Sequence, residues 1–403
     1  MENVEKNYNS FQIIDFKKHC SNRYYYADGF HEKMPITNKC TWKPTLLLQD
    51  ALDYDYAYIW SEGKNLTDCC PDDLKNDYEA MANKFKAFFI SFEQARLKQD
   101  DVCFFDSLPV KFLKKWCELK NSICESVLET DAPLNYKFQK ELAVFLEELK
   151  SKELNLNWQN LSMTSKKASA LIRVRDEGKN TINYNQFGTV TGRLSTNNNS
   201  FPILTIDKAN RKIITPNNDL FLELDFNSAE LRTLLSLTGK KQPEMDIHAW
   251  IKENIYANKY ERSEVKEKVF KWLYNPSAQN KKLNSYFERD KIVEKYFDGE
   301  SITNPFSRKI KVDKRRAVNY LIQSTTNDLV LRQALKIHKF LKETNSFIAF
   351  TVHDSVVIDI HRDDRTKIEE MAKMFSETSM GTFKTNLSLG KNFGDMRQIQ
   401  WQQ

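Results

Sequence analysis

The 403-residue sequence contains no run of 18 apolar residues, so no segment is long enough to cross a bilayer as a helix. It also lacks internal repeats and low-complexity stretches. Its first residues, Met1-Glu2-Asn3, open a polar, charged segment without an apolar core, and we expect no signal peptide. These absences predict a cytoplasmic protein with no membrane partner.

Cysteine is scarce and confined to the first third of the chain. None of the seven cysteines belongs to a Cys-x-x-Cys pair, and their odd number and irregular spacing predict reduced thiols. They are Cys20, Cys40, Cys69, Cys70, Cys103, Cys117 and Cys124. A zinc site made of His19, Cys20, His31 and Cys40 is disfavoured because its spacing matches no common zinc motif.

Neither sign of charge dominates the composition. The chain has 61 Lys and Arg residues against 55 Asp and Glu residues, a net charge of +6. This excess permits binding to nucleic acid, but the same charge spread evenly is an ordinary solvated surface. The length predicts two or three subdomains rather than one compact domain.

Residues 221–232, FLELDFNSAELR, are the stretch around which the chain is organised. Alternation over residues 221–224 predicts a short buried strand that ends in Asp225, and Glu230 opens a helix after a polar turn. A carboxylate at the end of a buried strand is costly to desolvate unless a cation compensates it. Taken alone, this stretch is explained equally well by a helix-capping Asp225 and a surface Glu230.

A second stretch favours the functional interpretation. Residues 347–360, FIAFTVHDSVVIDI, read as two apolar, largely β-branched strands joined by a turn at His353-Asp354-Ser355. Asp354 is therefore expected on the tip of a hairpin. Two such tips side by side place two carboxylates within reach of a shared pair of divalent metal ions, about 3.5–4 Å apart, as in two-metal phosphoryl transfer.

These two stretches resemble motifs of family A DNA polymerases, the bacterial DNA polymerase I type. DFNSAELR is similar to their motif A, and VHDS is similar to their motif C. The resemblance runs from about residue 107 to the C-terminus and is strongest over residues 191–360. It implies that Asp225, Asp354 and the backbone carbonyl of Phe226 hold two Mg²⁺ ions, with Mn²⁺ as a substitute.

The nucleotide site implied by the resemblance centres on one helix. Arg262, Lys266, Phe270 and Tyr274 stand four residues apart on RSEVKEKVFKWLY, which predicts a helical stripe about 18 Å long. Two cations near the helix N-terminus followed by two aromatic rings match the order triphosphate, sugar, base. The pattern resembles the family's fingers helix, R-x3-K-x3-F-x3-Y, in which Lys266 would also donate a proton to pyrophosphate.

Two more residues complete the implied nucleotide site. His248, in a segment that matches the family's D-I-H, would contact the incoming triphosphate. Glu230, counted with the catalytic residues, would pack against Tyr274 and close the space that a ribose 2′-hydroxyl needs.

Further residues are expected to contact the primer and template. Phe187–Ser195, FGTVTGRLS, resembles the family's T-G-R-L-S element, in which Arg193 would reach the primer end. Arg315, Asn319 and Gln323 repeat a four-residue spacing and match residues that contact the minor groove, where acceptors are present for every base pair. His353 is expected to contact DNA as well. A solvated helix face is the alternative for the triplet.

The first 104 residues predict a small α+β region without an intact exonuclease. A proofreading 3′–5′ exonuclease needs a strand-borne Asp-x-Glu. Before residue 105 that pattern occurs at Asp77-Tyr78-Glu79, in a polar helical stretch after Pro71. Beyond this region, apolar spacing predicts amphipathic helices at residues 108–128 and 136–154.

The resemblance implies an α+β, right-hand polymerase that adds dNTPs to a primer 3′-hydroxyl without proofreading. The predicted parts are a thumb at 105–175, a palm of antiparallel sheet and helices at 176–240 and 306–403, and helical fingers at 241–305. Its partners would be primer-template DNA and dNTPs. Separately encoded exonuclease, helicase or primase proteins are further candidates. The short chain is similar to phage-encoded members, which would act in the host cytoplasm.

One departure from the family keeps two alternatives open. The residue after the second aspartate is usually acidic in family A DNA polymerases, whereas here it is Ser355. Single-subunit phage RNA polymerases also carry His-Asp-Ser, so an RNA polymerase is the first alternative, against which Glu230 argues. A catalytically inactive factor that binds primer-template is the second, and the retained pair Asp225 and Asp354 argues against it.

Overall fold

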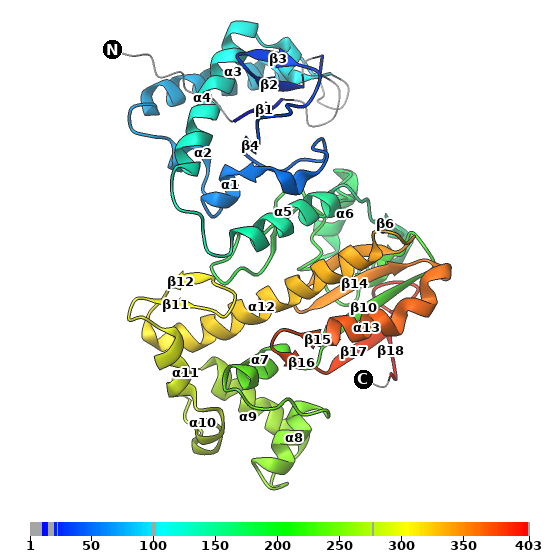
Figure 1. The fold of residues 1–403 in the computed structure, drawn as a ribbon. Helices are drawn as coiled ribbons and strands as arrows, with labels where there is room; N and C mark the ends of the chain where they lie inside the picture. Colours follow the sequence, from blue (N-terminus) through cyan, green and yellow to red (C-terminus); the bar gives the residue numbers. More distant parts are fainter. Residues whose placement is uncertain (1–9, 15–19, 22, 98–101, 276–277, 402–403) are drawn as a thin grey trace. The chain divides into compact units, whose positions relative to one another are not determined.

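The computed structural model describes residues 10–14, 20–21, 23–97, 102–275 and 278–401. The chain divides into two compact units, Met1–Glu148 and Leu149–Gln403. Both units combine helices with sheets, so the predicted α+β class is confirmed (Figure 1).

The first unit contains a small antiparallel sheet of order β1-β2-β3 and a parallel pair, β4 with β5. Its strands are β1 (Gln12–Ile13), β2 (Tyr24–Tyr26), β3 (Gly29–His31), β4 (Cys40–Thr41) and β5 (Asp55–Tyr56). Its helices include α1 (Ala57–Trp60), α2 (Leu66–Cys69), α3 (Lys75–Gln94) and α4 (Val110–Leu128). The mixture of helix and strand predicted for residues 1–104 is therefore confirmed.

The two amphipathic helices predicted after residue 105 are also present. The first is α4, and the second is α5 (Tyr136–Lys150), which ends four residues before the predicted end. The core between α3 and α4 is aromatic, because the ring of Phe85 lies 5.3 Å from both Phe104 and Trp116, measured between centroids. Such pairs add to the hydrophobic stabilisation that burial of the rings already provides.

The acidic pair Asp77 and Glu79 lies on α3 and not on a strand. The Asp77 side chain is 64% exposed and faces the Lys115 ammonium at 3.9 Å. The expectation that this Asp-x-Glu belongs to a solvated helix is confirmed.

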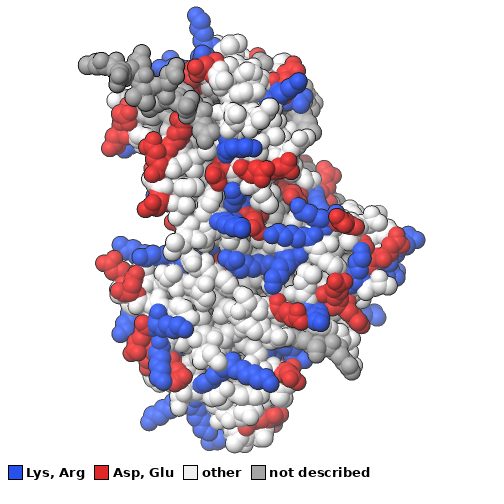
Figure 2. All heavy atoms as spheres, in the orientation of Figure 1, with Lys and Arg blue, Asp and Glu red and all other residues white. Residues whose placement is uncertain are grey.

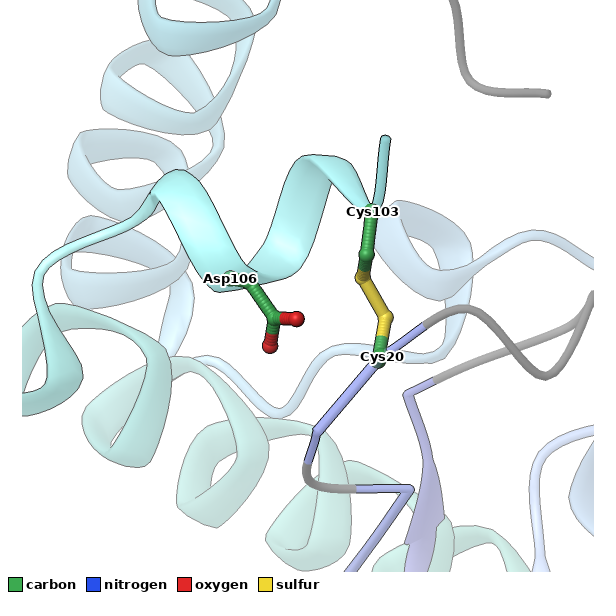
Figure 3. A group of neighbouring side chains, drawn as sticks. All are labelled: Cys20, Cys103 and Asp106. Carbon is green, nitrogen blue, oxygen red and sulfur yellow. A yellow bond between two sulfur atoms is a disulfide. The ribbon is translucent and has the colours of Figure 1, made fainter. Parts of the chain in front are cut away.

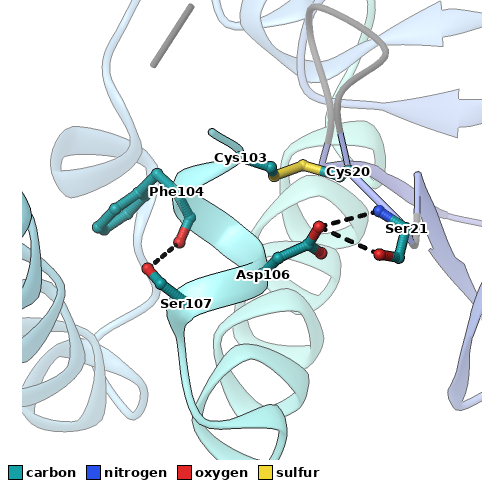
Figure 4. The surroundings of a disulfide bond; sticks show 6 residues. All are labelled: Cys20, Ser21, Cys103, Phe104, Asp106 and Ser107. Carbon is teal, nitrogen blue, oxygen red and sulfur yellow. Dashed lines mark hydrogen bonds between the residues drawn. A yellow bond between two sulfur atoms is a disulfide. The ribbon is translucent and has the colours of Figure 1, made fainter. Parts of the chain in front are cut away.

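The prediction that all cysteines are reduced is wrong for one pair. Cys20 and Cys103, 83 residues apart in sequence, form a disulfide with their Cα atoms 5.1 Å apart (Figure 4). The other five cysteines are free. Spacing rules detect local cysteine pairs, whereas this pair is assembled by the fold of the first unit.

Asp106 lies beside that disulfide (Figure 3). Its carboxylate accepts hydrogen bonds from the Ser21 backbone N–H at 3.0 Å and the Ser21 hydroxyl at 3.2 Å (Figure 4). Cys20 is therefore engaged by Cys103 and not by His31 or Cys40. The remaining member of the disfavoured zinc set, His19, lies outside the described residues.

The second unit is organised around a five-stranded antiparallel sheet of order β13-β14-β10-β17-β18 (Figure 1). Its strands are β13 (Phe347–Val352), β14 (Ser355–Ile360), β10 (Leu220–Phe226), β17 (Thr385–Gly390) and β18 (Arg397–Ile399). The two predicted strands that flank Asp354 are β13 and β14, and they form the expected hairpin. Strand β10 is central and pairs with β14 on one side and β17 on the other.

Alternation gives β10 two different faces, since successive side chains of a strand point to opposite sides. Leu222, Leu224 and Phe226 are fully buried on one side. The ring of Phe226 stacks on Phe375 of α13 (Ile368–Ser376), with centroids 4.3 Å apart. The other side carries the buried ring of Phe221 and then, towards the end of the strand, the carboxylates of residues 223 and 225.

A long helix, α12 (Lys314–Leu341), is buried over most of its circumference and packs against β13, β14, α13 and α7 (Ala229–Leu237). Between α7 and α12 lie α8 (Ile247–Asn254), α9 (Arg262–Tyr274), α10 (Lys281–Phe287) and α11 (Arg289–Tyr296), followed by the hairpin of β11 (Ser301–Thr303) and β12 (Lys309–Lys311). The helix predicted for RSEVKEKVFKWLY is α9, with the same bounds.

Shorter elements complete the second unit. They are α6 (Ala168–Asp176) and the strand pairs β6 (Asn155–Leu156) with β9 (Ile214–Thr215), β7 (Tyr184–Asn185) with β8 (Ser195–Thr196), and β15 (Glu377–Thr378) with β16 (Gly381–Thr382). Among the described residues, no helix has the length and apolar character of a membrane span. Figure 2 shows Lys and Arg side chains interspersed with Asp and Glu over the face in view. The finer division into palm, fingers and thumb stays a prediction.

Candidate active site

Asp225 and Asp354 come from neighbouring strands of the central sheet. In the antiparallel register of β10 and β14, Asp225 lies directly opposite Ser355, the residue that follows Asp354. Asp354 occupies the two-residue turn between β13 and β14, and His353 before it takes the left-handed conformation with φ 54°. The fold therefore brings together the two carboxylates that the sequence placed on separate strand tips.

Burial and mutual repulsion disfavour ionisation of this pair. Burial raises the pKa of Asp225 from its ordinary value of 3.8 to about 7, and the charge of Asp354 adds to the rise. A hydrogen bond from the Asn386 side chain, 3.2 Å from the Asp225 carboxylate, opposes it. Burial also raises the pKa of Asp354. A bound divalent cation would relieve both effects, because it favours the ionised form of each carboxylate.

A third carboxylate on the same face, Glu223, was missed by the sequence reasoning. Glu223 and Asp225 are two residues apart on β10 and therefore point to the same side of the sheet. Burial raises the pKa of Glu223, and the nearby Ser355 hydroxyl donates to the Val352 carbonyl at 3.1 Å. The alternating pattern of LELDF indicates this arrangement, because it places both acidic side chains on one face of the strand and the apolar side chains on the other.

A pocket of about 220 Å³ opens next to Asp354. Its lining residues come from the start of α7, from α8, from the C-terminal half of α9 and from the middle of α12, together with the turn after β13 and the segment before β8. Seven residues predicted for the site line it: Arg193, Glu230, His248, Phe270, Tyr274, His353 and Asp354. The fold thus gathers residues from segments that are up to 161 positions apart, counted from Arg193 to Asp354.

Glu230 contacts two other side chains on one side of this pocket. It accepts a hydrogen bond from the Tyr274 hydroxyl and forms an ion pair with the Arg193 guanidinium. Burial raises the pKa of Tyr274 above its usual range, and the interaction with Glu230 adds to the rise. The predicted contact between Glu230 and Tyr274 is present in the structure, together with an ion pair to Arg193 that the sequence did not predict.

Aromatic rings line the α9 side of the pocket. The Phe270 ring is roughly parallel to the rings of Tyr274 and His248, at centroid distances of 5.6 and 6.2 Å. His248 is 2% exposed, and neither ring nitrogen has a hydrogen-bond partner among the described residues. Burial lowers the pKa of His248 to about 4. Two unpaired buried nitrogens beside a pocket mark a place where a polar ligand group would be stabilised.

The two cations of the α9 stripe differ in their surroundings. Arg262 donates to both carboxylate oxygens of Asp246, at 2.9 and 2.7 Å. Burial opposes ionisation of Asp246, but hydrogen bonds led by that from Arg262 lower its pKa well below its usual range. Lys266 is exposed, with its ammonium 5.7 Å from the centre of the Phe270 ring.

Arg232 is a buried cation whose structural role was not predicted from the sequence. Its side chain has no solvent exposure and donates to the backbone carbonyls of Asn227, Pro243 and Met245, each at 2.8 Å. Burial lowers its pKa to about 10. These bonds fix the loop that leads into α8, and so they position the helix that carries His248.

A second buried cation supports the turn before Arg193. Arg308 binds the fully buried Asp328 carboxylate, with guanidinium nitrogens 2.7 and 3.0 Å from its oxygens. Gly192 takes φ +78°, and a Cβ there would lie 2.5 Å from the central carbon of that guanidinium. The Asn327 side chain donates to the Gly192 carbonyl at 2.7 Å. Arg308 and Asn327 therefore hold this turn from two sides. Glycine is required at position 192 because φ is positive there and because a Cβ would collide with the Arg308 guanidinium.

Arg315, Asn319 and Gln323 lie four residues apart on α12, so they share one face of the helix. Arg315 is exposed, and Asn319 donates to the Tyr274 carbonyl at 3.4 Å. None of the three lines the pocket, and their predicted contact with the minor groove stays a prediction.

The sequence is similar to those of known DNA polymerases. The profile described as DNA polymerase family A matches residues 256–395. DNA polymerase I of Chloroflexus aurantiacus is 24% identical, and the match covers 54% of this chain and 29% of that protein. The DNA polymerase of Bacillus phage SP01 is 23% identical, over 53% of this chain and 31% of that protein. The chain thus spans less than a third of the length of these two relatives.

Among solved structures, the polymerase domain of Pol1 from M. smegmatis, in complex with DNA primer-template and dNTP, aligns with a TM-score of 0.48. The sequence identity is 14%, and the alignment covers 68% of this chain and 55% of that chain.

Proposed function

We propose that this chain is a member of DNA polymerase family A and that it extends a DNA primer with dNTPs on a DNA template. One observation carries the proposal. Residues from motif A, motif C and the fingers helix, which are distant in sequence, surround one pocket beside two buried carboxylates. That arrangement matches a reaction in which a nucleotide must meet a primer end and divalent metal ions together.

Asp225 and Asp354 are suited to hold Mg²⁺. Carboxylate and carbonyl oxygens are the hard ligands that Mg²⁺ and Mn²⁺ prefer, and Phe226 would add its backbone carbonyl. The raised pKa values of both aspartates fit a site that is stabilised by added positive charge. When bound, two such ions supply the charge that activates a 3′-hydroxyl and neutralises the α-phosphate and pyrophosphate.

The α9 stripe would bind and orient the nucleotide. Lys266 and Arg262 would hold the triphosphate, and Lys266 would donate a proton to the leaving pyrophosphate. Arg262 must first exchange its Asp246 partner for phosphate oxygens. His248 would donate a hydrogen bond from one of its unpaired ring nitrogens to a phosphate oxygen.

Sugar selection would rest on Phe270, Glu230 and Tyr274. The hydrogen bond between Glu230 and Tyr274 closes one side of the pocket, where a ribose 2′-hydroxyl would have to fit. This supports a preference for deoxynucleotides. A single-subunit RNA polymerase is the second candidate, because Ser355 completes the His-Asp-Ser sequence of that class.

The remaining residues would bind DNA. Arg193 and His353 border the pocket and would meet the primer end, while Arg315, Asn319 and Gln323 would donate to minor-groove acceptors. We also propose that residues 1–104 carry no exonuclease, which is supported by the helical, exposed setting of Asp77.

The test is extension of a labelled primer on a DNA template, with Mg²⁺ and either dNTPs or NTPs. We expect template-directed extension with dNTPs and much slower extension with NTPs. Preference for NTPs would favour the RNA polymerase candidate. Tight binding of primer-template with no extension from either substrate would favour an inactive binding factor.

A further inference from the structure

Cys20, Cys103 and Asp106 form a compact group of side chains in the first unit (Figure 3). The sulfur of each cysteine and one carboxylate oxygen of Asp106 all lie within 4.8 Å of one another. Within the described part of the chain, no other three His, Cys, Asp or Glu side chains come together closely enough to hold one metal ion. The proposed polymerase reaction gives this group no role.

The three residues come from two segments that are far apart in the sequence. Cys20 precedes β2, whereas Cys103 and Asp106 belong to the start of the short 3₁₀ helix Phe104–Ser107 that leads into α4. The Cα atoms of the two cysteines are 5.1 Å apart, close enough for their sulfurs either to bond to each other or to share one ion. Both cysteines are buried and Asp106 is exposed, so the group is open to solvent on the Asp106 side.

Asp106 is anchored through one of its two carboxylate oxygens. That oxygen accepts both hydrogen bonds from Ser21, the residue that follows Cys20 (Figure 4). The other oxygen has neither a hydrogen-bond donor nor a cation as partner among the residues that the structure describes. Carboxylates that bind metal ions are typically held by hydrogen bonds in this way, which fix their orientation.

Two thiolates and one carboxylate are a donor set that favours zinc. Thiolates are soft ligands that select Zn²⁺ over Mg²⁺ or Ca²⁺, and Zn²⁺ accepts both Cys and Asp side chains in tetrahedral sites. A Zn–S distance of about 2.3 Å in such a site places two sulfurs about 3.8 Å apart. Once the S–S bond is broken, rotation about each Cα–Cβ bond can provide this separation.

We propose that the reduced protein binds Zn²⁺ through Cys20, Cys103 and Asp106, with water as the fourth ligand. A dithiol reductant breaks the S–S bond and becomes a disulfide itself, and its two electrons and two protons convert the cysteines to thiols. Zn²⁺ then replaces the two thiol protons, which are released to solvent. Because disulfides are rare in reducing compartments, the zinc-bound form would be the resident state there.

The zinc ion and the disulfide would join the same two segments of the first unit. A structural zinc ion binds the folded state and not the unfolded state, so its binding free energy adds to stability. The simpler alternative is a disulfide without any metal-binding role. Reduction would then leave two thiols, and zinc would have no effect on the reduced protein.

Titration with Co²⁺, a spectroscopic substitute for Zn²⁺, separates these alternatives. The full chain is reduced with a phosphine, which is converted to its oxide, and the excess is removed under nitrogen before metal is added. We expect a single Co²⁺ per chain with the ultraviolet charge-transfer absorption of thiolate ligands, displaced by an equal amount of Zn²⁺. Cations bound to carboxylates elsewhere give no such absorption, and neither should protein with the disulfide intact. Absence of the band from the reduced protein would overturn the inference.

Asp106→Asn tests the third ligand with little disturbance, because asparagine can still accept the Ser21 hydrogen bonds. We expect it to weaken Zn²⁺ binding at least about 10-fold, measured by competition with a chromophoric chelator. Cys103→Ser should lose most of the binding. The control is Cys69→Ser, which removes a half-buried free cysteine of the same unit and should leave affinity unchanged. Equal affinity in Asp106→Asn and wild type, or loss of binding in Cys69→Ser, would contradict the assigned ligands.

Thermal denaturation provides a readout that does not depend on polymerase activity. Zn²⁺ should raise the Tm of the reduced wild type, raise that of reduced Asp106→Asn by less, and leave that of the oxidised protein unchanged. A Tm of the reduced wild type that does not respond to Zn²⁺ would contradict the proposed site.

Discussion

Replacement of Asp225 by Asn should stabilise the metal-free protein near neutral pH, even though it removes a proposed catalytic group. The folded state holds Asp225 beside Asp354 and raises the pKa of Asp225 to about 7, far above its ordinary value of 3.8. Between those two values the folded state binds more protons than the unfolded state, so wild-type stability falls as pH rises from about 4 to about 7.

The size of the change in stability follows from the same shift in the pKa of Asp225. Each tenfold change in an ionisation equilibrium is worth about 1.4 kcal/mol, so the full shift corresponds to about 4 kcal/mol as an upper bound. The coupling to Asp354 shares this cost between two groups, and Asn still accepts the Asn386 hydrogen bond, so we expect a gain of about 1–3 kcal/mol at pH 8. For a unit of this size, about 2–4 °C in Tm accompanies each kcal/mol.

The assay is thermal denaturation in EDTA from pH 4 to pH 8. The advantage of Asp225→Asn should be small at pH 4 and grow towards pH 7, and excess Mg²⁺ should stabilise wild type more than the variant. Asp364→Asn is the control of opposite sign. Its carboxylate binds Ser346 and Lys367, and these partners outweigh burial and lower its pKa, so removal of the charge should destabilise the protein above pH 4. An Asp225→Asn variant that is less stable than wild type across this range would refute the reasoning.

Three further predictions concern other parts of the chain. Phe270→Tyr should relax discrimination against dideoxynucleotides, and Glu230→Ala should admit ribonucleotides, each about 10- to 100-fold in the ratio of kcat/KM values; an unchanged ratio in single-nucleotide incorporation would contradict the assigned helix register. Gly192→Ala should raise KM for primer-template and lower Tm. The control Gly178→Ala should lower Tm alone, because Gly178 also has a positive φ but an added Cβ there would meet no atom within 4 Å. Equal KM values for the two variants would contradict the role of Gly192 in positioning this turn. Metal-dependent shortening of a labelled single strand, abolished by Asp77→Ala but not by Asp225→Ala, would contradict the absence of an exonuclease.

Local pattern predicted the elements of the site well. The four-residue spacing from Arg262 to Tyr274 gave α9 its bounds, and the apolar runs around Asp354 gave the β13–β14 hairpin. These succeed because periodicity and turn chemistry are properties of neighbouring residues. The resemblance to known motifs then indicated which of these elements would meet.

Contacts between residues that are distant in the sequence could not be predicted from the sequence alone. The disulfide of Cys20 with Cys103 and the ion pair of Arg308 with Asp328 each depend on tertiary packing, which spacing does not encode. Glu223 was overlooked for a different reason. An acidic residue in a strand reads as solvent-facing until the register of the neighbouring strand shows what lies beside it.

We propose that Asp225 and Asp354 together support nucleotide addition. The most direct test of this pair is the single-turnover rate of dNTP addition to a bound primer-template by wild type, Asp225→Ala and Asp354→Ala, with DNA binding measured in parallel. We predict retained DNA binding and a rate below about a hundredth of wild type in each variant, since charge stabilisation by the ions is worth several kcal/mol. Extension by either variant above that level would contradict the assignment of this pair as the metal-binding carboxylates.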